Sequence, residues 1–441
     1  MGALNGYSHL PVQVAFLLAS FLLMRRFYSH FPALASPEFR IFWIGQFVSL
    51  VGTWMQNTVQ PYLAYRLTSQ PLYLGLVGFA ATLPTLLFTL PGGVLIERLD
   101  KRRIVIVMQA VLMGQAFALA YLALTGQIHI WHIIALAFVL GTANSIEITA
   151  RQAMMIELVG KETLPNAIAL NSTAFNTARV LGPSIAAPFL LLLQRNGEGW
   201  AFFANGVSYA FVIISLLFIS RQPHPAPQSR RKDALTEFRD GLHYIKQTPV
   251  VATLIIMAAI LGFFAIPLGQ QIPVLASDVL GQIGEAQGAV AARNSALVTA
   301  QGAGALMAAI MLAALSTGTR RKGRLLMIGQ LAFGVAFLSL GLIRSLPLAL
   351  ALIAIFGWGV VTQLATTNTL IQLLVPDELR GRVISTYLWG LQGIAPFGSL
   401  LVGWMVQQWG LSTVVLMSGS ICLGSTVFIH FTTPALRRTV A

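Results

Sequence analysis

The chain has 441 residues, of which 56% are hydrophobic and only 10% carry a charge. Ordinary soluble domains have about 25% charged residues, so this composition excludes a water-soluble globule. Twelve membrane helices of roughly 20 residues each would use about 240 residues and leave about 200 for loops and ends. We therefore predict an all-α membrane protein.

A short apolar stretch, Leu10 to Met24, comes before the long apolar runs. Arg25 and Arg26 follow this stretch, whereas a cleaved secretory signal carries its positive charges in front of its apolar part. The stretch is also short for a membrane span. Residues 1–38 are predicted to be an interfacial N-terminal segment, with an additional membrane helix as the alternative.

Twelve long apolar runs follow, and each is predicted to cross the membrane. The polar stretch 221–249, with its prolines and basic residues, is predicted to be a cytoplasmic linker between two six-helix bundles. These bundles cover 39–220 and 250–431, and 432–441 form a cytoplasmic tail. The predicted spans are 39–66, 72–96, 104–126, 131–151, 164–194, 200–220, 250–276, 295–316, 325–343, 347–370, 382–408 and 411–431.

The basic residues indicate the orientation of these spans. The chain has 28 Lys and Arg residues against 14 Asp and Glu residues, a net charge of +14. When the loops are assigned alternately to the two sides, 23 basic residues fall on one side and four on the other, and Arg179 lies inside a span. The positive-inside rule makes the crowded side cytoplasmic, with both ends of the twelve-helix body inside. The charge is thus a topology signal, and we expect no nucleic-acid binding.

The sequence offers no motif for catalysis, metals or cofactors. Cys422 is the single cysteine and cannot form an intramolecular disulfide, and the seven histidines form no metal-ligand pattern. GAGALMA (302–308) lies within a predicted span and is interpreted as helix packing, not as a dinucleotide loop. A lipid-modifying enzyme would need clustered His, Asp or Ser at one membrane face, and the sequence predicts no such cluster. We therefore expect neither an enzyme nor a bound metal or cofactor.

The two predicted bundles repeat each other weakly. LVGKETL (158–164) leads into span five and LVPDEL (374–379) leads into span eleven. Such repetition is typical of secondary transporters, whose substrate site lies between the repeats. A channel is the less favoured alternative, because no charged ring is evident.

Longer motifs resemble a known family over nearly the whole predicted body. GGVLIERLDKRR (92–103) is similar to the cytoplasmic signature of the major facilitator superfamily, with Glu97 where aspartate is usual and Asp100 where glycine is common. RQAMMIELVGKETLPNAIALNSTAFNTARVLGP (151–183) and NTLIQLLVPDELRGRVIS (368–385) resemble its bacterial branch of enterobactin exporters and drug:proton antiporters, called transmembrane secretion effectors.

The resemblance implies a fold of two pseudo-symmetric six-helix bundles that expose a central site to each side of the membrane in turn. It also implies a monomer in the bacterial inner membrane that exports small amphipathic substrates, drug-like or siderophore-like, in exchange for protons. A lysophospholipid or lipid flippase of the same fold is the alternative, since an apolar cavity also suits membrane lipid.

The loop between spans two and three is predicted to form a cytoplasmic gate with the start of span eleven. Glu97 could cap the amino terminus of span eleven, where unpaired N–H groups and the helix dipole favour an anion. Bonds that exist only when the cytoplasmic side is closed would bias the transport equilibrium. The alternative is that these charges only fix the topology and contact lipid phosphates. The predicted gate residues are Gly93, Glu97, Arg98, Arg102, Asp377 and Arg380.

Gly182 and Pro183 in span five are predicted to form a hinge. Glycine lets helices approach closely, and proline frees a carbonyl group that neighbours can satisfy. Ordinary tight packing is the alternative.

Polar residues recur within the predicted spans. Gln46, Ser49, Thr53, Asn57 and Gln60 share one face of span one, because they are spaced by three or four residues. In hydrocarbon such a face must contact protein or water. Together with aromatic residues of other spans they are predicted to line a substrate cavity, although each alone could equally make an interhelical hydrogen bond. The predicted cavity residues are Gln46, Thr53, Asn57, Asn176, Phe263, Trp358, Gln363, Trp389 and Gln392.

Glu147 and Arg179 are ionisable residues that lie clearly within predicted spans. Such residues are costly at the bilayer centre and usually mark a function or a paired partner. Arg151 follows Glu147 by four residues, on the same helix face. These three residues are predicted to couple transport to protons, as the carboxyl group exchanges a proton when an arginine approaches or leaves. A permanent structural salt bridge is the alternative.

Overall fold

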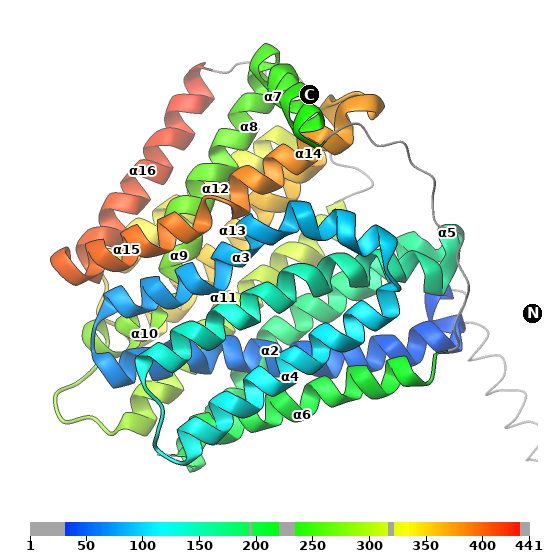
Figure 1. Ribbon diagram of the computed structural model, residues 1–441. Helices are drawn as coiled ribbons and strands as arrows, with labels where there is room; N and C mark the ends of the chain where they lie inside the picture. Colours follow the sequence, from blue (N-terminus) through cyan, green and yellow to red (C-terminus); the bar gives the residue numbers. More distant parts are fainter. Residues whose placement is uncertain (1–30, 194–195, 220–233, 316–321, 433–441) are drawn as a thin grey trace, which may run out of the picture.

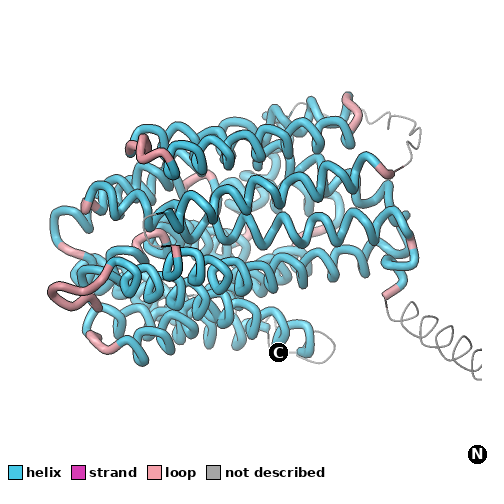
Figure 2. Tube along the Cα trace, turned by 90° about the horizontal axis from the view of Figure 1, so that it is seen from below, coloured by secondary structure: helices cyan, strands magenta, loops and turns pink. Residues whose placement is uncertain are grey.

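The computed structural model describes residues 31–193, 196–219, 234–315 and 322–432. Figure 2 shows that the elements of this part of the chain are all helical and are joined by short loops. By length and composition, nine of the described helices can cross a membrane. Most of the predicted N-terminal segment, the start of the predicted linker and most of the predicted tail lie outside the described residues. The prediction of twelve spans remains a prediction.

The N-terminal half is a bundle of long helices (Figure 1). A short 3-10 turn, η1 (Pro32–Ala35), precedes it, and Ser36 then caps the first long helix by accepting a hydrogen bond from the Phe39 amide at 3.3 Å. The helices of this half are α2 (Pro37–Thr68), α3 (Pro71–Arg98), α4 (Lys101–Leu124), α5 (Ile130–Leu192) and α6 (Gly197–Leu217).

Helix α5 contains two predicted spans in one helical run of 63 residues. At 1.5 Å per residue a straight helix of this length would extend about 95 Å, about three times the hydrocarbon thickness of a membrane. Gly160 interrupts it with φ 75° and ψ 170°, a conformation that residues with a Cβ atom rarely adopt. The loop expected over 152–163 is therefore helical apart from this one glycine, because its remaining residues are good helix formers.

The C-terminal half contains interrupted helices. The predicted span 250–276 is divided by a π-helical turn and by Gln270, and the predicted span 382–408 is divided at Gly393. A proline at the start of each following piece, Pro273 and Pro396, has no backbone N–H to continue the hydrogen-bond pattern of the preceding helix. The elements are α7 (Ala234–Gln247), α8 (Pro249–Ile260), η3 (Leu261–Ala265), α9 (Ile266–Gly269), α10 (Ile272–Val274), η4 (Leu275–Val279), α11 (Gln287–Leu315), α12 (Lys322–Leu342), α13 (Leu346–Leu374), α14 (Asp377–Gln392), α15 (Ala395–Trp409) and α16 (Leu411–Thr432).

The two halves meet mainly through two helix pairs, α5 with α11 and α3 with α15. Glycines allow the second pair to touch at the backbone. A Cβ atom on Gly75 would lie 2.5 Å from the Ser399 carbonyl oxygen, and one on Gly403 would lie 2.8 Å from the Gly75 Cα. Any side chain at this crossing would therefore separate the halves.

The halves are not in contact equally at the two ends of the bundle. We call the end of the bundle with the α2–α3 connection the Thr68 end, and the end with the α3–α4 connection the Asp100 end. Helix α3 packs along α15 at the Thr68 end but only touches α14, which extends away from it at the other end (Figure 1). The largest apolar cluster joins both halves and includes Leu63, Leu74 and Ile272. The halves thus close together at the Thr68 end and diverge toward the Asp100 end.

Candidate substrate cavity and buried charge cluster

A cavity of about 330 Å³ lies between the two halves. One wall comes from α2, α3 and α5, and the other from α9, α10, α11 and α13. Most of the wall is apolar, with a few polar groups, which is the usual make-up of a site for a small organic molecule. The polar or charged residues that line it are Asn57, Thr58, Gln60, Arg179, Gln270, Asn294 and Gln301.

Arg179 is the charged residue among the described residues that line this cavity. Its guanidinium carbon lies 5.3 Å from the centroid of the Trp54 ring, a cation–π contact. Helix α11 passes close by, since a Cβ atom on Gly302 would lie 2.6 Å from the Arg179 carbonyl oxygen. A positive charge is therefore held where the two halves meet.

Asn57 is the predicted cavity residue that lines this cavity. Two others hydrogen-bond within one half: the Gln363 amide donates to the Met257 carbonyl at 3.2 Å, and Thr53 lies 3.2 Å from the Tyr209 hydroxyl. The spacing of polar residues identifies a helix face but not the neighbour that this face meets. The predicted cavity residues that lie outside its lining are Gln46, Thr53, Asn176, Phe263, Trp358, Gln363, Trp389 and Gln392.

Much of the polar face of α2 is directed into the N-terminal bundle itself. The Gln56 amide donates to Gln60 at 3.1 Å and to Gln115 at 3.2 Å, and the Asn205 amide donates to Gln56 at 2.7 Å. All four side chains are buried. This network fixes α2 against α4 and α6 and so holds the cavity wall in place.

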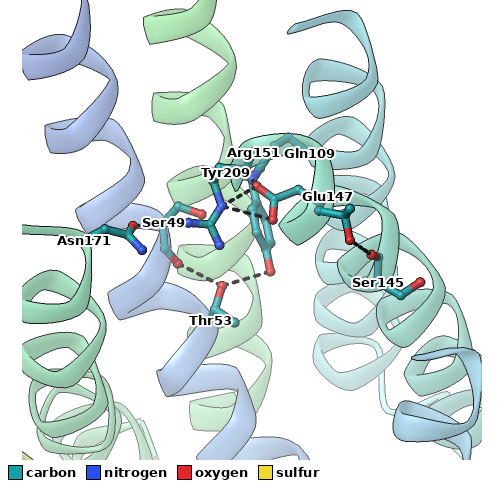
Figure 3. Close-up of polar contacts among 9 residues, drawn as sticks. Ser49, Thr53, Gln109, Ser145, Glu147, Arg151, Asn171 and Tyr209 are labelled. Atoms are coloured by element: carbon teal, nitrogen blue, oxygen red, sulfur yellow. Dashed lines mark hydrogen bonds and ion pairs between the residues drawn. The ribbon is translucent and has the colours of Figure 1, made fainter. Parts of the chain in front are cut away.

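Glu147 and Arg151 form a buried ion pair one helical turn apart (Figure 3). Arg151 Nε donates to the two carboxylate oxygens at 3.0 Å and 3.3 Å, and Gln109 Nε2 donates to Oε1 at 3.1 Å. Arg151 Nη1 also donates to Asn171 Oδ1 at 3.2 Å, beyond the Gly160 break. We call Gln109, Glu147, Arg151 and Asn171 the charge cluster. The carboxylate thus accepts hydrogen bonds from side chains of two helices, α4 and α5.

Arg179 does not join the charge cluster. It has no ion pair among the described residues, and its contact is with Trp54 at the cavity. The sequence prediction grouped Arg179 with Glu147 because both lie in apolar spans, but in the structure the Gly160 break separates Arg179 from Glu147 along α5.

The predicted gate is only partly described. The side chains of Gly93, Glu97, Arg98 and Asp377 lie outside the described residues, and Arg380 lies half-buried near the start of α14. Arg102 donates to the carbonyl oxygens of Leu216 at 2.8 Å and Leu217 at 3.3 Å, within the N-terminal half. In this conformation it therefore stabilises the carboxyl end of α6.

Gly182 of the predicted hinge lies where α5 crosses α2. A Cβ atom on it would lie 2.5 Å from the Trp54 Cβ and 2.7 Å from the Met55 amide nitrogen. The helix continues through Pro183. Close helix packing accounts for this glycine in the described conformation, and the hinge remains a prediction.

Three amides of the C-terminal half that line the cavity, Gln270, Asn294 and Gln301, are absent from the predicted set. Asn294 lies one residue before the predicted span eight, and Gln301 follows it by two helical turns on the same face. A search for polar residues spaced by seven, extended past the span boundary, would have found this pair.

Side chains also bridge the halves at the Thr68 end. The Tyr65 hydroxyl donates to Asp278 Oδ2 at 2.6 Å, and the Tyr62 hydroxyl donates to the Gln287 carbonyl at 3.1 Å. Both tyrosines belong to α2, whereas their partners belong to the C-terminal half. These bonds join the two halves at this end in the described conformation.

Tyr65→Phe is expected to shift the conformational equilibrium about fivefold toward the state that is open at the Thr68 end, because one hydrogen bond to an exposed carboxylate contributes about 1 kcal/mol. The distance between spin labels at Leu67 and Thr413, both exposed and in opposite halves, would report it in a background with Cys422 replaced by alanine. Tyr121→Phe, at an exposed tyrosine of α4, is the matched control. An unchanged distance distribution for Tyr65→Phe would contradict the role of this bond.

Comparison with known proteins identifies relatives over most of the chain. The family described as transmembrane secretion effector matches residues 28–439. The chain is 25% identical over 367 residues to the multidrug efflux pump Tap of Mycolicibacterium fortuitum, which covers 81% of this chain and 86% of Tap. It is also 25% identical over 373 residues to the enterobactin exporter EntS of Escherichia coli, which covers 83% of this chain and 85% of EntS.

Solved structures share the fold at low identity. The nucleoside transporter NupG superposes with a TM-score of 0.66 at 13% identity, over 90% of this chain and 98% of NupG. A D-xylose–proton symporter superposes with a TM-score of 0.67 at 14% identity, over 88% of this chain and 97% of the symporter. Family and fold are those of transporters rather than enzymes. The chain therefore belongs to the transmembrane secretion effector family of the major facilitator superfamily, as a multi-pass membrane transporter.

Proposed function

We propose that this transporter exports small amphipathic molecules by alternating access, driven by a proton gradient. The observation that carries the proposal is the cavity of about 330 Å³ between two halves that close over it at the Thr68 end and diverge at the Asp100 end. Its apolar wall with a few amides suits an amphipathic ligand. The similarity to an efflux pump and to a siderophore exporter supports the outward direction.

The positive-inside rule supports an orientation with the Asp100 end in the cytoplasm of a bacterium and both ends of the helical body inside. The described conformation then accepts substrate from the cytoplasm. In the opposite conformation, Glu97, Arg98 and Arg102 would meet Asp377 and Arg380 as the cytoplasmic gate. Arg102 would exchange its bonds to α6 for bonds across the halves, so that the monomer alternates between two sets of contacts.

The charge cluster is the proposed site of proton coupling. A carboxylate that is buried with one arginine partner can accept a proton only if that arginine finds other acceptors. Asn171 already accepts a hydrogen bond from Arg151 and provides one such acceptor. Proton binding at Glu147 would thereby be linked to the arrangement of α5.

The proposal is tested in proteoliposomes that contain the purified protein and have an acidic interior. We expect an amphipathic dye to accumulate inside as protons leave, with saturation at high dye concentration and loss of uptake when a protonophore removes the gradient. Protein-free liposomes control for passive partitioning. Dye flux that is the same with and without the proton gradient would contradict proton coupling. Translocation of a labelled lysophospholipid without any dye transport would favour the flippase instead.

A further inference from the structure

The central cavity has a charge that no neighbouring carboxylate balances. Arg179 has Trp54 as its contact and no ion pair among the described residues, while the buried carboxylate of Glu147 is paired with Arg151 and Gln109. A cation held within an apolar span is costly unless a counter-charge or water compensates it. A site that keeps an arginine in this state is built to receive an anion.

The same cavity also holds an amide without hydrogen bonds. Asn294 is fully buried in the wall formed by α11, and both its Nδ2 and Oδ1 lack partners among the described residues. Leaving both atoms unsatisfied costs free energy, which a bound polar group would recover. Arg179 and Asn294 come from opposite halves of the protein and both line the cavity, so a ligand in the cavity would lie between the halves.

Helix α11 separates these two polar positions along the cavity. Gly302 of α11 lies against the Arg179 carbonyl, and Asn294 lies eight residues before Gly302, or about 12 Å along the helix. Trp54, Phe356 and Val360 contribute apolar surface to the same lining. The cavity wall thus carries a cation and an amide at positions that are separated along α11.

We infer that the substrate is an amphipathic organic anion, whose carboxylate, sulfonate or phosphate group binds Arg179 while a second hydrogen-bonding group reaches Asn294. The inference rests on the proposed function, since it names the substrate class of the same cavity. The apolar body of the ligand packs against the Trp54 ring. Because the anion displaces no existing ion partner of Arg179, binding does not have to break a salt bridge. A cation of the same shape is repelled by the guanidinium group.

The test uses two dyes with the same xanthene ring system and opposite charge, carboxyfluorescein as the anion and rhodamine 123 as the cation. Binding to the purified protein in detergent is measured by fluorescence anisotropy, independently of transport. We expect the anion to bind more tightly, and Arg179→Gln to weaken its binding by at least about tenfold, as loss of a charged hydrogen bond implies. Arg179→Lys keeps the charge and is expected to retain part of the affinity.

Two further variants separate charge from general effects. Asn294→Leu, of similar size, is expected to weaken binding of the anion without changing its preference over the cation. Lys246→Gln removes one positive charge from the exposed face of α7, a helix that contributes no residue to the cavity lining, and is expected to leave binding unchanged. Competition by lysophosphatidylglycerol distinguishes a lipid anion from a free organic acid, and an anion of either source supports the inference.

The outcomes for the two proposals are separable. If the wild-type protein binds the cation as tightly as the anion, or binds neither, or if Arg179→Gln leaves binding of the anion unchanged, the inference is overturned. Gradient-driven transport of the cation would then still support export. Conversely, binding of the anion that depends on Arg179, without transport under a pH gradient, would overturn the export proposal and leave the binding site standing.

Discussion

Glu147→Leu is expected to destabilise the protein by about 3–5 kcal/mol, because it leaves the buried guanidinium of Arg151 without its counter-charge. Glu147 is only 3% exposed and Arg151 only 8% exposed, so water cannot replace the lost carboxylate. Gln109 would lose its acceptor as well. Thermal unfolding of the purified protein in detergent, followed by loss of the monodisperse peak in gel filtration, measures the effect.

Companion variants decide whether the charge cluster couples protons or only supports the fold. The double variant Glu147→Leu with Arg151→Leu removes both charges and is expected to recover much of the stability. If the pair couples transport to protons, gradient-driven transport stays lost in this stable double variant. If the pair is a structural salt bridge, transport returns with stability. A Glu147→Leu variant as stable as the wild type would contradict the burial argument itself.

Gly75→Val is expected to separate the halves at the Thr68 end and to hold the transporter open there. The added Cβ would lie 2.5 Å from the Ser399 carbonyl oxygen and 3.0 Å from the Gly403 Cα, both backbone atoms that cannot move aside. Overpacking of this kind costs about 1–3 kcal/mol, which corresponds to an about 5- to 150-fold shift between the two conformations. Turnover is expected to fall, because the cycle needs both states.

The same label pair at Leu67 and Thr413 measures this shift, as an increased fraction of long distances. Gly114→Val in α4 is the matched control, since a Cβ atom at Gly114 would have no neighbour within 4 Å. A fully unfolded Gly75→Val protein would show loss of helical circular dichroism rather than a second distance population. If the distances and turnover of Gly75→Val equal those of Gly114→Val, this crossing does not control the closure.

The sequence predicted correctly those contacts that follow from the spacing of residues within one helix or from a short local motif. A four-residue separation on one helix placed Arg151 over Glu147, and the structure has that ion pair at 3.0 Å. GAGALMA was expected to be a packing motif, and within it Gly302 meets α5 while Gly304 meets the Ala354 carbonyl of α13. The ion pair depends only on the pitch of a single helix, and the glycine motif depends on small residues that let neighbouring helices approach closely.

Other features depend on how helices are rotated against each other, which local spacing does not contain. Gln363 was expected to line a cavity but hydrogen-bonds Met257, because its face of α13 meets α8. Asn294 was not expected, because a hydropathy boundary excluded it from span eight although α11 already begins at Gln287. Polar residues in a membrane helix therefore predict contact with protein. The tertiary packing decides whether such a residue lines the cavity or makes a hydrogen bond to a neighbouring helix.

One hydrogen bond of the charge cluster spans the glycine break within α5. Glu147 and Arg151 lie before Gly160, and Asn171 lies after it. The Arg151–Asn171 hydrogen bond therefore connects the two arms of α5 across the break. This hydrogen bond joins the two arms of α5, together with an apolar cluster in which Met155 packs with Ala167 and Leu170. If Glu147 is the proposed proton site, its neutralisation would release the Arg151 guanidinium from the carboxylate, and the arrangement of the two arms would depend on protonation. Arg179 lies on the second arm, so the proposed coupling would link the protonation of Glu147 to the position of the charge in the cavity.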